Sequence, residues 1–157
     1  MKRIGCMAVH YGAEYIAWAV ESLQVAVDEV HVFYTPTPSY GFVDRAMKVP
    51  ASDREDALRA EANRRAFAPV IWHRLDGLRS ESMHRSHMLE YARSKGATTM
   101  TVVDADEIWD PSSLEASLHA VETANRAGRW LARFHNFWRS WGWTVKDAFR
   151  PVRIVDI

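Results

Sequence analysis

Short apolar runs alternate with segments of helical periodicity along most of the chain, and this alternation limits the possible folds more than any other feature. Strands are expected at residues 3–10, 30–34, 69–75 and 100–103, with further candidates at 128–137 and 150–157. Helices are expected at residues 16–27, 53–67 and 80–96, and from residue 111 onwards. Because repeated strand–helix–strand units form parallel sheets covered by helices, this order predicts an α/β fold. The sheet is expected to be mostly parallel, with helices on both faces.

Local signals mark where several of these helices begin and end. Ser52 is followed three residues later by Glu55, which is the spacing of a capping box at a helix start. Asp110 precedes Pro111, so a helix is expected to begin there with an aspartate cap. Gly96 follows a helical pattern and is expected to end that helix.

The size and composition are those of a single globular domain, residues 1–157, and they exclude several classes of protein. The 157 residues carry 20 basic and 20 acidic side chains, so no net charge directs the chain to nucleic acid or anionic lipid. The single cysteine, Cys6, excludes an internal disulfide and a thiolate metal cluster. No apolar run reaches the roughly 20 residues of a membrane-spanning helix, and the N-terminal apolar stretch is too short for a signal peptide. We therefore expect a cytoplasmic protein without a transmembrane segment.

The segment "TTMTVVDADEIWD" places Asp104, Asp106 and Glu107 directly after a buried strand. In sheets of this kind ligands bind beyond the carboxyl ends of the strands, so the acids are expected to lie in a cleft. If the segment stays extended, Asp104 and Asp106 point to the same side. Two such carboxylates can share Mn²⁺ or Mg²⁺, whose other ligands are commonly substrate phosphates and water. The alternative is a group of solvated acids beside a helix start.

Three segments, in the same order, resemble GT-A fold glycosyltransferases, especially family 2-type enzymes with a D-A-D-E version of the D-x-D motif. These segments are "MAVHYGAEYIAWAVESLQVAVDEVHVFYT", "MHRSHMLEYARSKGATTMTVVDADE" and "VVDADEIWDPSSL", and they fall within residues 3–120. The resemblance implies a single GT-A-like domain. Its nucleotide-sugar-binding part would be about 1–120, and a short acceptor-side part would be about 121–157.

The resemblance also implies roles for individual residues. Asp106 would bind the metal directly, whereas Asp104 would contact the nucleotide ribose or bind the metal through water. Arg85 would lie near the nucleotide or the diphosphate, as suits a guanidinium. Thr35 stands where many relatives carry an acid that recognises the base. The other implied substrate-binding residues are His10, Tyr11, Gly12 and Glu14, of which Glu14 is alternatively an acid that meets a helix dipole.

The C-terminal part supplies candidates for the acceptor side. An inverting enzyme needs a carboxylate base, and Asp147 is the candidate because it follows the aromatic-rich segment "WGWTVKDAFRP". The other acids there are Asp156 and the helical Glu115 and Glu122, and the last two are expected to face solvent. Trp138 and Trp141 could stack on a sugar, or instead form an apolar cluster or a dimer contact.

Histidines offer further metal alternatives. His84 and His87 are three residues apart on an expected helix and could bind zinc. His135 could complete a Mn²⁺ site, or lie hydrogen-bonded in the core.

The function expected from these features is metal-dependent transfer of a sugar from a nucleotide-diphosphate donor to an acceptor hydroxyl, with inversion. The acceptor is expected to be a glycan, a lipid-linked sugar or a small molecule, and less so a nucleic acid. A nucleotidyltransferase is a second enzyme hypothesis, although "VHYGAEYI" lacks the Gly-rich basic loop typical of that class. The non-enzyme hypothesis is a truncated domain that binds a nucleotide sugar or a partner. A homo-oligomer or a partner chain would fit the short acceptor side.

Overall fold

The structure is a computed structural model of the chain, and it describes residues 1–37, 51–77, 80–124, 128–131, 136–137, 144–145 and 152–157. In chain order its elements are β1 (Arg3–Val9), α1 (Ile16–Gln24), β2 (Glu29–Tyr34), α2 (Glu55–Arg64), β3 (Val70–Arg74), α3 (Glu81–Ser94), β4 (Thr99–Asp104), α4 (Pro111–Thr123), β5 (Arg129–Leu131), β6 (Asn136–Phe137), β7 (Thr144–Val145) and β8 (Val152–Asp156). The strands and helices predicted up to residue 124 are all present.

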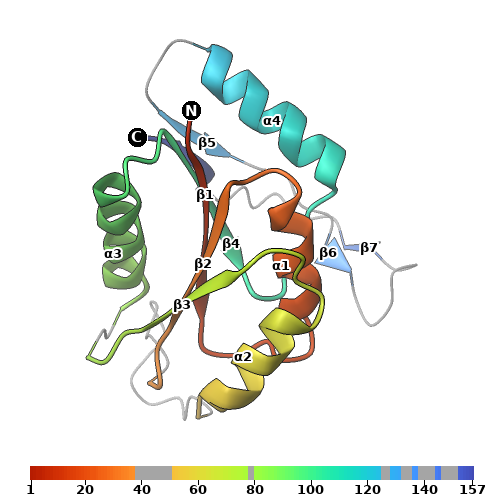
Figure 1. Ribbon diagram of the computed structural model, residues 1–157, viewed down its shortest axis with the longest axis vertical. Coiled ribbons are helices and arrows are strands. Elements are labelled where there is room, and N and C mark those ends of the chain that lie inside the picture. Colours follow the sequence, from red (N-terminus) through yellow and green to blue (C-terminus); the bar gives the residue numbers. More distant parts are fainter. Residues whose placement is uncertain (38–50, 78–79, 125–127, 132–135, 138–143, 146–151) are drawn as a thin grey trace.

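Six strands form one sheet in the order β3-β2-β1-β4-β8-β5, and β6 pairs with β7 separately (Figure 1). The four strands from β3 to β4 are parallel, whereas β8 is antiparallel to both of its neighbours. The expected α/β class with a mostly parallel sheet is therefore confirmed. Because β1 and β4 are parallel neighbours, their carboxyl ends lie at the same edge, with Ala8 opposite Asp104.

Helices cover both faces of the sheet, as predicted (Figure 1). Successive strand side chains point to opposite faces, so β1 sends Ile4 and Cys6 to one face and Met7 and Val9 to the other. The first pair packs in the cluster that α3 completes, and the second packs with α1, α2 and α4. In the part of the chain that the structure describes, no helix has both the length and the apolar character needed to span a membrane.

The start of α4 follows the local capping rules, whereas the start of α2 departs from them. Asp110 caps α4 by accepting a hydrogen bond from the Ser113 backbone N–H at 2.8 Å, and Pro111 follows as predicted. The capping box predicted at Ser52 is wrong, because Arg54 is the N-cap of α2 and makes no side-chain cap. The Ser52 hydroxyl donates instead to the Thr35 carbonyl at 3.2 Å. The chain before α2 thus satisfies backbone groups at the end of β2 and not at its own helix.

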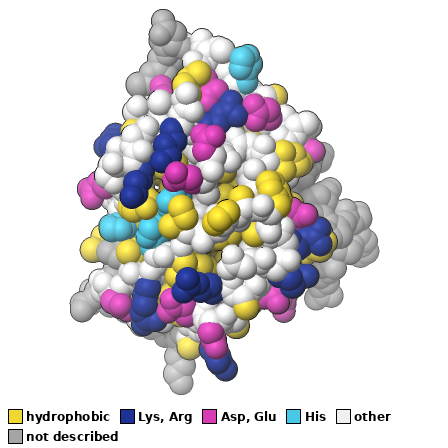
Figure 2. All heavy atoms as spheres, viewed as in Figure 1, with side chains coloured by type: hydrophobic (Ala, Val, Ile, Leu, Met, Phe, Trp, Pro, Cys, Tyr) yellow, Lys and Arg dark blue, Asp and Glu magenta, His cyan; other side chains and the backbone are white. Residues whose placement is uncertain are grey.

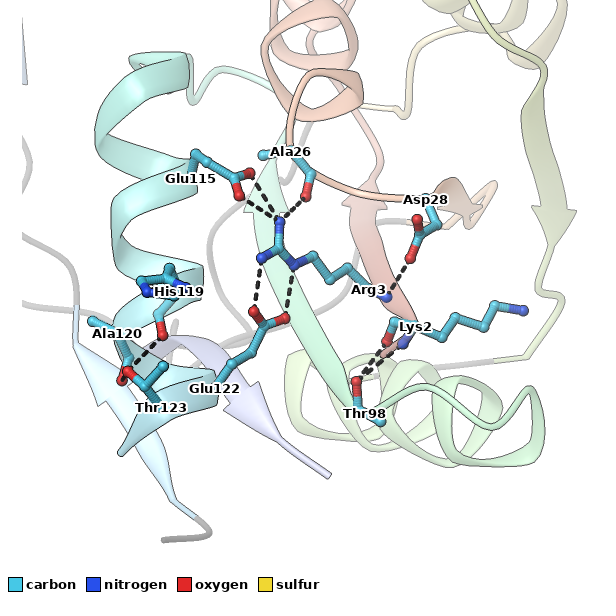
Figure 3. A network of polar contacts seen from close by, with 10 residues as sticks. All are labelled: Lys2, Arg3, Ala26, Asp28, Thr98, Glu115, His119, Ala120, Glu122 and Thr123. Atoms are coloured by element: carbon cyan, nitrogen blue, oxygen red, sulfur yellow. Dashed lines mark hydrogen bonds and ion pairs between the residues drawn. The ribbon is translucent and has the colours of Figure 1, made fainter. Parts of the chain in front are cut away.

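An ion-pair cluster attaches α4 to the start of β1 (Figure 3). The Arg3 guanidinium donates to both oxygens of Glu122, to Glu115 and to the Ala26 carbonyl, over 2.7 to 3.2 Å. The prediction that Glu122 faces solvent is wrong, since its side chain is only 5% exposed. Glu115 is about half exposed and also pairs with Arg3. The partly buried charge of Arg3 explains why α4 turns these two acids towards it.

Histidine side chains gather between α3 and the β2–β3 edge of the sheet (Figure 2). His31 Nδ1 lies 3.0 Å from His73 Nε2, and the His73 ring stacks on Phe33. His87 also contacts Phe33, whereas His84 lies against His10, the residue directly after β1. Within the described residues, no three side chains of His, Cys, Asp or Glu are arranged to hold a metal ion. The zinc alternative therefore finds no third ligand there.

Candidate functional site

A cavity of about 500 Å³ lies at the carboxyl ends of β1 and β4, beside the first turn of α3. This is the edge at which parallel α/β sheets bind ligands. Its lining residues are Ala8, His10, Tyr11, Gly12, Tyr15, Glu81, His84, Arg85, Asp104, Ala105 and Asp106. Six of the residues predicted to bind substrate or metal are among them: His10, Tyr11, Gly12, Arg85, Asp104 and Asp106.

Asp104, the last residue of β4, is held between two guanidinium groups. Its Oδ1 accepts from Arg85 at 3.3 Å, and its Oδ2 accepts from Arg153 of β8 at 2.8 Å. Glu107 completes the arrangement, because one of its oxygens pairs with Arg153 and the other accepts from the Asp104 backbone N–H at 3.1 Å. Burial raises the pKa of the Glu107 carboxyl, and Arg153 opposes that rise.

Asp106 presents its carboxylate differently. The chain turns after β4, and the Glu107 backbone N–H donates to the Asp104 carbonyl at 3.0 Å. The extended geometry assumed from the sequence is therefore wrong beyond Asp104. Both aspartates nevertheless line the cavity, and so does the largely buried Ala105 between them. Asp106 is exposed and makes no hydrogen bond or ion pair with another described residue.

The first turn of α3 supplies the charges that face these acids. Arg85 donates to Glu81 at 2.7 Å, one helical turn earlier, and its side chain is 29% exposed. Ser80 caps this turn by accepting from the Met83 backbone N–H. Among the described residues, four carboxylates and two guanidinium groups lie around the cavity and its wall, a formal excess of two negative charges. These charged residues are Glu81, Asp104, Asp106, Glu107, Arg85 and Arg153.

Aromatic rings form another part of the cavity lining. His10 lies 5.5 Å from His84 and 6.2 Å from Tyr11 between ring centroids, and Tyr15 adds a half-exposed ring. Burial lowers the pKa of His10. Burial lowers the pKa of His84 to about 4, and the neighbouring His10 adds to this effect. The nearby Phe33 backbone partly opposes the shift, although neither ring nitrogen of His84 makes a hydrogen bond with a described residue. Both imidazoles are therefore neutral near pH 7. They do not offset the net negative charge of the acids and arginines around the cavity.

Gly12 lets the turn after β1 approach the turn after β4. Its φ is +108°, and a Cβ at this position would lie 2.6 Å from the Ala105 Cβ. The Gly12 and Ala13 backbone N–H groups donate to the Asp53 carboxylate at 3.0 and 3.2 Å. These donors at the start of α1 are thus occupied by an internal anion.

Other predicted site residues fall elsewhere. Thr35 is buried behind the cavity, where its hydroxyl contacts His10 Nδ1. Glu14 is exposed just before α1 and does not line the cavity. Asp147, Trp138, Trp141 and His135 lie outside the described residues.

Four contributors to the site are absent from the sequence prediction: Tyr15, Glu81, His84 as a lining residue, and Arg153. Glu81 could have been found from the sequence, because it stands four residues before Arg85 on a predicted helix, the spacing of an ion pair. Arg153 is 49 residues from Asp104 in the chain, so no local spacing connects them.

A second cavity, of about 410 Å³, lies at the amino end of the sheet around Arg3. It is lined by Glu115, Glu122 and Asp28, which already accept hydrogen bonds from Arg3. Since these charged groups already contact one another, we assign this cavity to the attachment of α4.

Comparison with known proteins adds little to this geometry. No family model matches the chain, and no curated protein matches it. Among solved structures it is similar to TarS of S. aureus, a glycosyltransferase, with 18% identity and a TM-score of 0.42. The match covers 81% of this chain and 21% of TarS, so the chain spans about a fifth of that protein. At that TM-score the likeness does not establish a shared activity.

Proposed function

We propose that this chain is a metal-dependent glycosyltransferase of GT-A type that binds a nucleotide-diphosphate sugar in the cavity at the β1–β4 edge. The observation that carries the proposal is the placement of Asp106, an acid without a described partner, beside the Asp104–Arg85 ion pair. An anion-binding guanidinium and a cation-binding carboxylate thus share one cleft, as a diphosphate–metal complex requires.

The residues present fit a divalent cation such as Mn²⁺ or Mg²⁺. The excess of two negative charges that the described residues place in and around the cavity would balance the two positive charges of such an ion. Asp106 would hold the ion directly, and Asp104 would act on the ribose or through water. The described residues offer fewer than three ligands, so diphosphate oxygens and water would complete the coordination. The ion would supply neutralisation of the diphosphate leaving group.

Arg85 would position the diphosphate from the other side of the cleft. Its contact with Asp104 is 3.3 Å long and partly exposed, so a phosphate oxygen can replace it at small cost. The aromatic side formed by His10, Tyr11 and Tyr15 offers flat surfaces on which a base can stack. An acceptor hydroxyl would attack the anomeric carbon, with Asp147 as the proposed base if the reaction inverts. The acceptor and a cytoplasmic location stay predictions.

The nucleotidyltransferase hypothesis is less well supported. Such an enzyme would use backbone N–H groups after β1 to bind phosphates. Here Gly12 and Ala13 donate theirs to Asp53, which would have to leave first. The non-catalytic hypothesis predicts donor binding without turnover, so a hydrolysis or transfer assay separates it from the proposal.

Calorimetric titration of UDP and of GDP, each with and without Mn²⁺, tests the proposed function directly. We expect one of them to bind only with Mn²⁺, and Asp106→Asn to weaken that binding at least about tenfold because a direct charged ligand is lost. Asp56→Asn is the control, since Asp56 is an exposed acid that pairs with Arg54 on α2. The absence of nucleotide binding under every condition would refute the donor site.

A further inference from the structure

Arg153 holds Asp104 from behind the cavity. Its side chain is 5% exposed, and its guanidinium contacts both Asp104 and Glu107. We propose that Arg153 is a positioning residue that fixes the Asp104 carboxylate away from the cation, so that Asp106 alone is the direct metal ligand. This inference rests on the proposed function, and it adds a residue from the C-terminal strand to the site.

The two guanidinium groups that hold Asp104 are not equivalent. The Arg153 guanidinium, on a side chain that is 5% exposed, approaches Oδ2 to 2.8 Å, whereas Arg85, whose side chain is 29% exposed, approaches Oδ1 to 3.3 Å; the Asp104 side chain itself is 36% exposed. Leaving a buried guanidinium without its acid partner is expensive, while a long and exposed ion pair contributes little. When a diphosphate enters, Arg85 can therefore change partner and Arg153 cannot. Asp104 keeps its orientation through that exchange.

Glu107 closes the arrangement into a ring. One oxygen of Glu107 contacts Arg153, and the other accepts from the Asp104 backbone N–H at 3.1 Å. The main chain and the side chain of Asp104 are thus both fixed through Arg153 and Glu107. Removing the Arg153 charge would leave two carboxylates facing each other beside Asp106, and Asp104 would be free to turn towards a cation.

Arg153→Met tests this role by metal binding, without an activity assay. Free Mn²⁺ is measured by electron paramagnetic resonance at pH 7.5, first with protein alone and then with the nucleotide that binds. Because an uncompensated carboxylate joins the site, Arg153→Met is expected to bind Mn²⁺ alone about tenfold more tightly than wild type. It is expected to bind the nucleotide with Mn²⁺ about tenfold more weakly, since Asp104 now competes for the ion. The double variant Arg153→Met/Asp104→Asn should return the affinity for Mn²⁺ alone towards the wild-type value.

Arg129→Met is the matched control, because Arg129 is an exposed arginine on β5, adjacent to β8. If Arg153→Met does not fold, Arg153→Lys answers the same question, since it keeps the charge but not the planar guanidinium. We expect a shift of about threefold in the same two directions, weaker because one charge compensates the acids. Unchanged affinities, or affinities that both fall, in a folded Arg153 variant would overturn the inference alone. If wild type binds neither Mn²⁺ nor nucleotide, the proposed function fails and this inference falls with it.

Discussion

His84 is a buried imidazole that lines the cavity, and it shows how a single residue can lower the stability of the fold. It is 1% exposed, and neither ring nitrogen has a hydrogen-bond partner among the described residues. The charged neighbours that act on its pKa are all basic: His10, directly after β1, and Arg85 and His87 on α3. A buried polar group without a hydrogen bond lowers the free energy of unfolding. His84 therefore reduces stability at a position that lines the proposed ligand site.

The lowered pKa of His84 predicts a loss of stability in mild acid. The unfolded chain takes up a proton near pH 6.5, whereas the folded chain resists it until about pH 4. Stability from this residue is complete above pH 6.5 and falls as the pH drops through that window, by about 2 kcal/mol at pH 5. Denaturant unfolding at pH 7.5 and pH 5 should therefore show a smaller acid loss in His84→Met than in wild type. His119→Met, on the exposed face of α4, should keep the wild-type difference, and an equal loss in all three proteins would contradict the assignment.

At the scale of elements, α4 is attached to the sheet by one arginine and two unequal glutamates. The side chains of Arg3 and Glu122 are both largely buried where they pair. Arg3 also pairs with Glu115, whose side chain is about half exposed. Buried and exposed ion pairs differ in energetic weight because solvent screens the second. The same guanidinium thus offers an internal comparison of the two.

Glu122→Gln should destabilise the protein by about 2–3 kcal/mol, since it leaves the partly buried Arg3 charge with one exposed partner. Glu115→Gln should cost less than about 1 kcal/mol, because that contact is screened by water. The two free energies of unfolding, measured with guanidinium chloride under identical conditions, check the difference. Equal costs for the two glutamates would show that burial does not govern the attachment of α4.

The elements themselves were largely predictable, because their signals are local. The apolar run Met100–Val103, followed by the Asp110 cap and Pro111, predicts β4 and the start of α4, and both are observed. The direction of β8 was not predictable, since an apolar run indicates a strand without its orientation. The inward turn of Glu122 depends on Arg3, which is 119 residues away. The same limit applies to the site, where Arg153 reaches Asp104 only through the folded sheet.

At the scale of the whole molecule, the cavity forms where two turns that are far apart in the chain lie side by side. The turn after β1 carries Gly12, and the turn after β4 carries Ala105 and Asp106, directly after Asp104 at the end of the strand. Parallel pairing of β1 with β4 brings the two turns to one edge, although about ninety residues separate them in the chain. The absence of a side chain at Gly12 then sets how closely they approach. Sheet order and one glycine together determine the width of the proposed donor site.

Gly12→Ala should therefore be more damaging than an alanine at another glycine of similar conformation. Both Gly12 (φ +108°) and Gly77 (φ +86°) lie in a region that alanine rarely adopts, which costs roughly 1–2 kcal/mol. Only at Gly12 would the new Cβ meet Ala105, at 2.6 Å, whereas at Gly77 no described atom lies within 4 Å. We expect Gly12→Ala to lose about 1–3 kcal/mol more than Gly77→Ala, the usual cost of overpacking, and to lower nucleotide affinity by shifting Asp106. Parallel denaturant titrations and calorimetry of the two variants measure both effects. If the two variants unfold alike and bind alike, the contact between the turns does not set the cavity, and the aspartates are positioned by β4 alone.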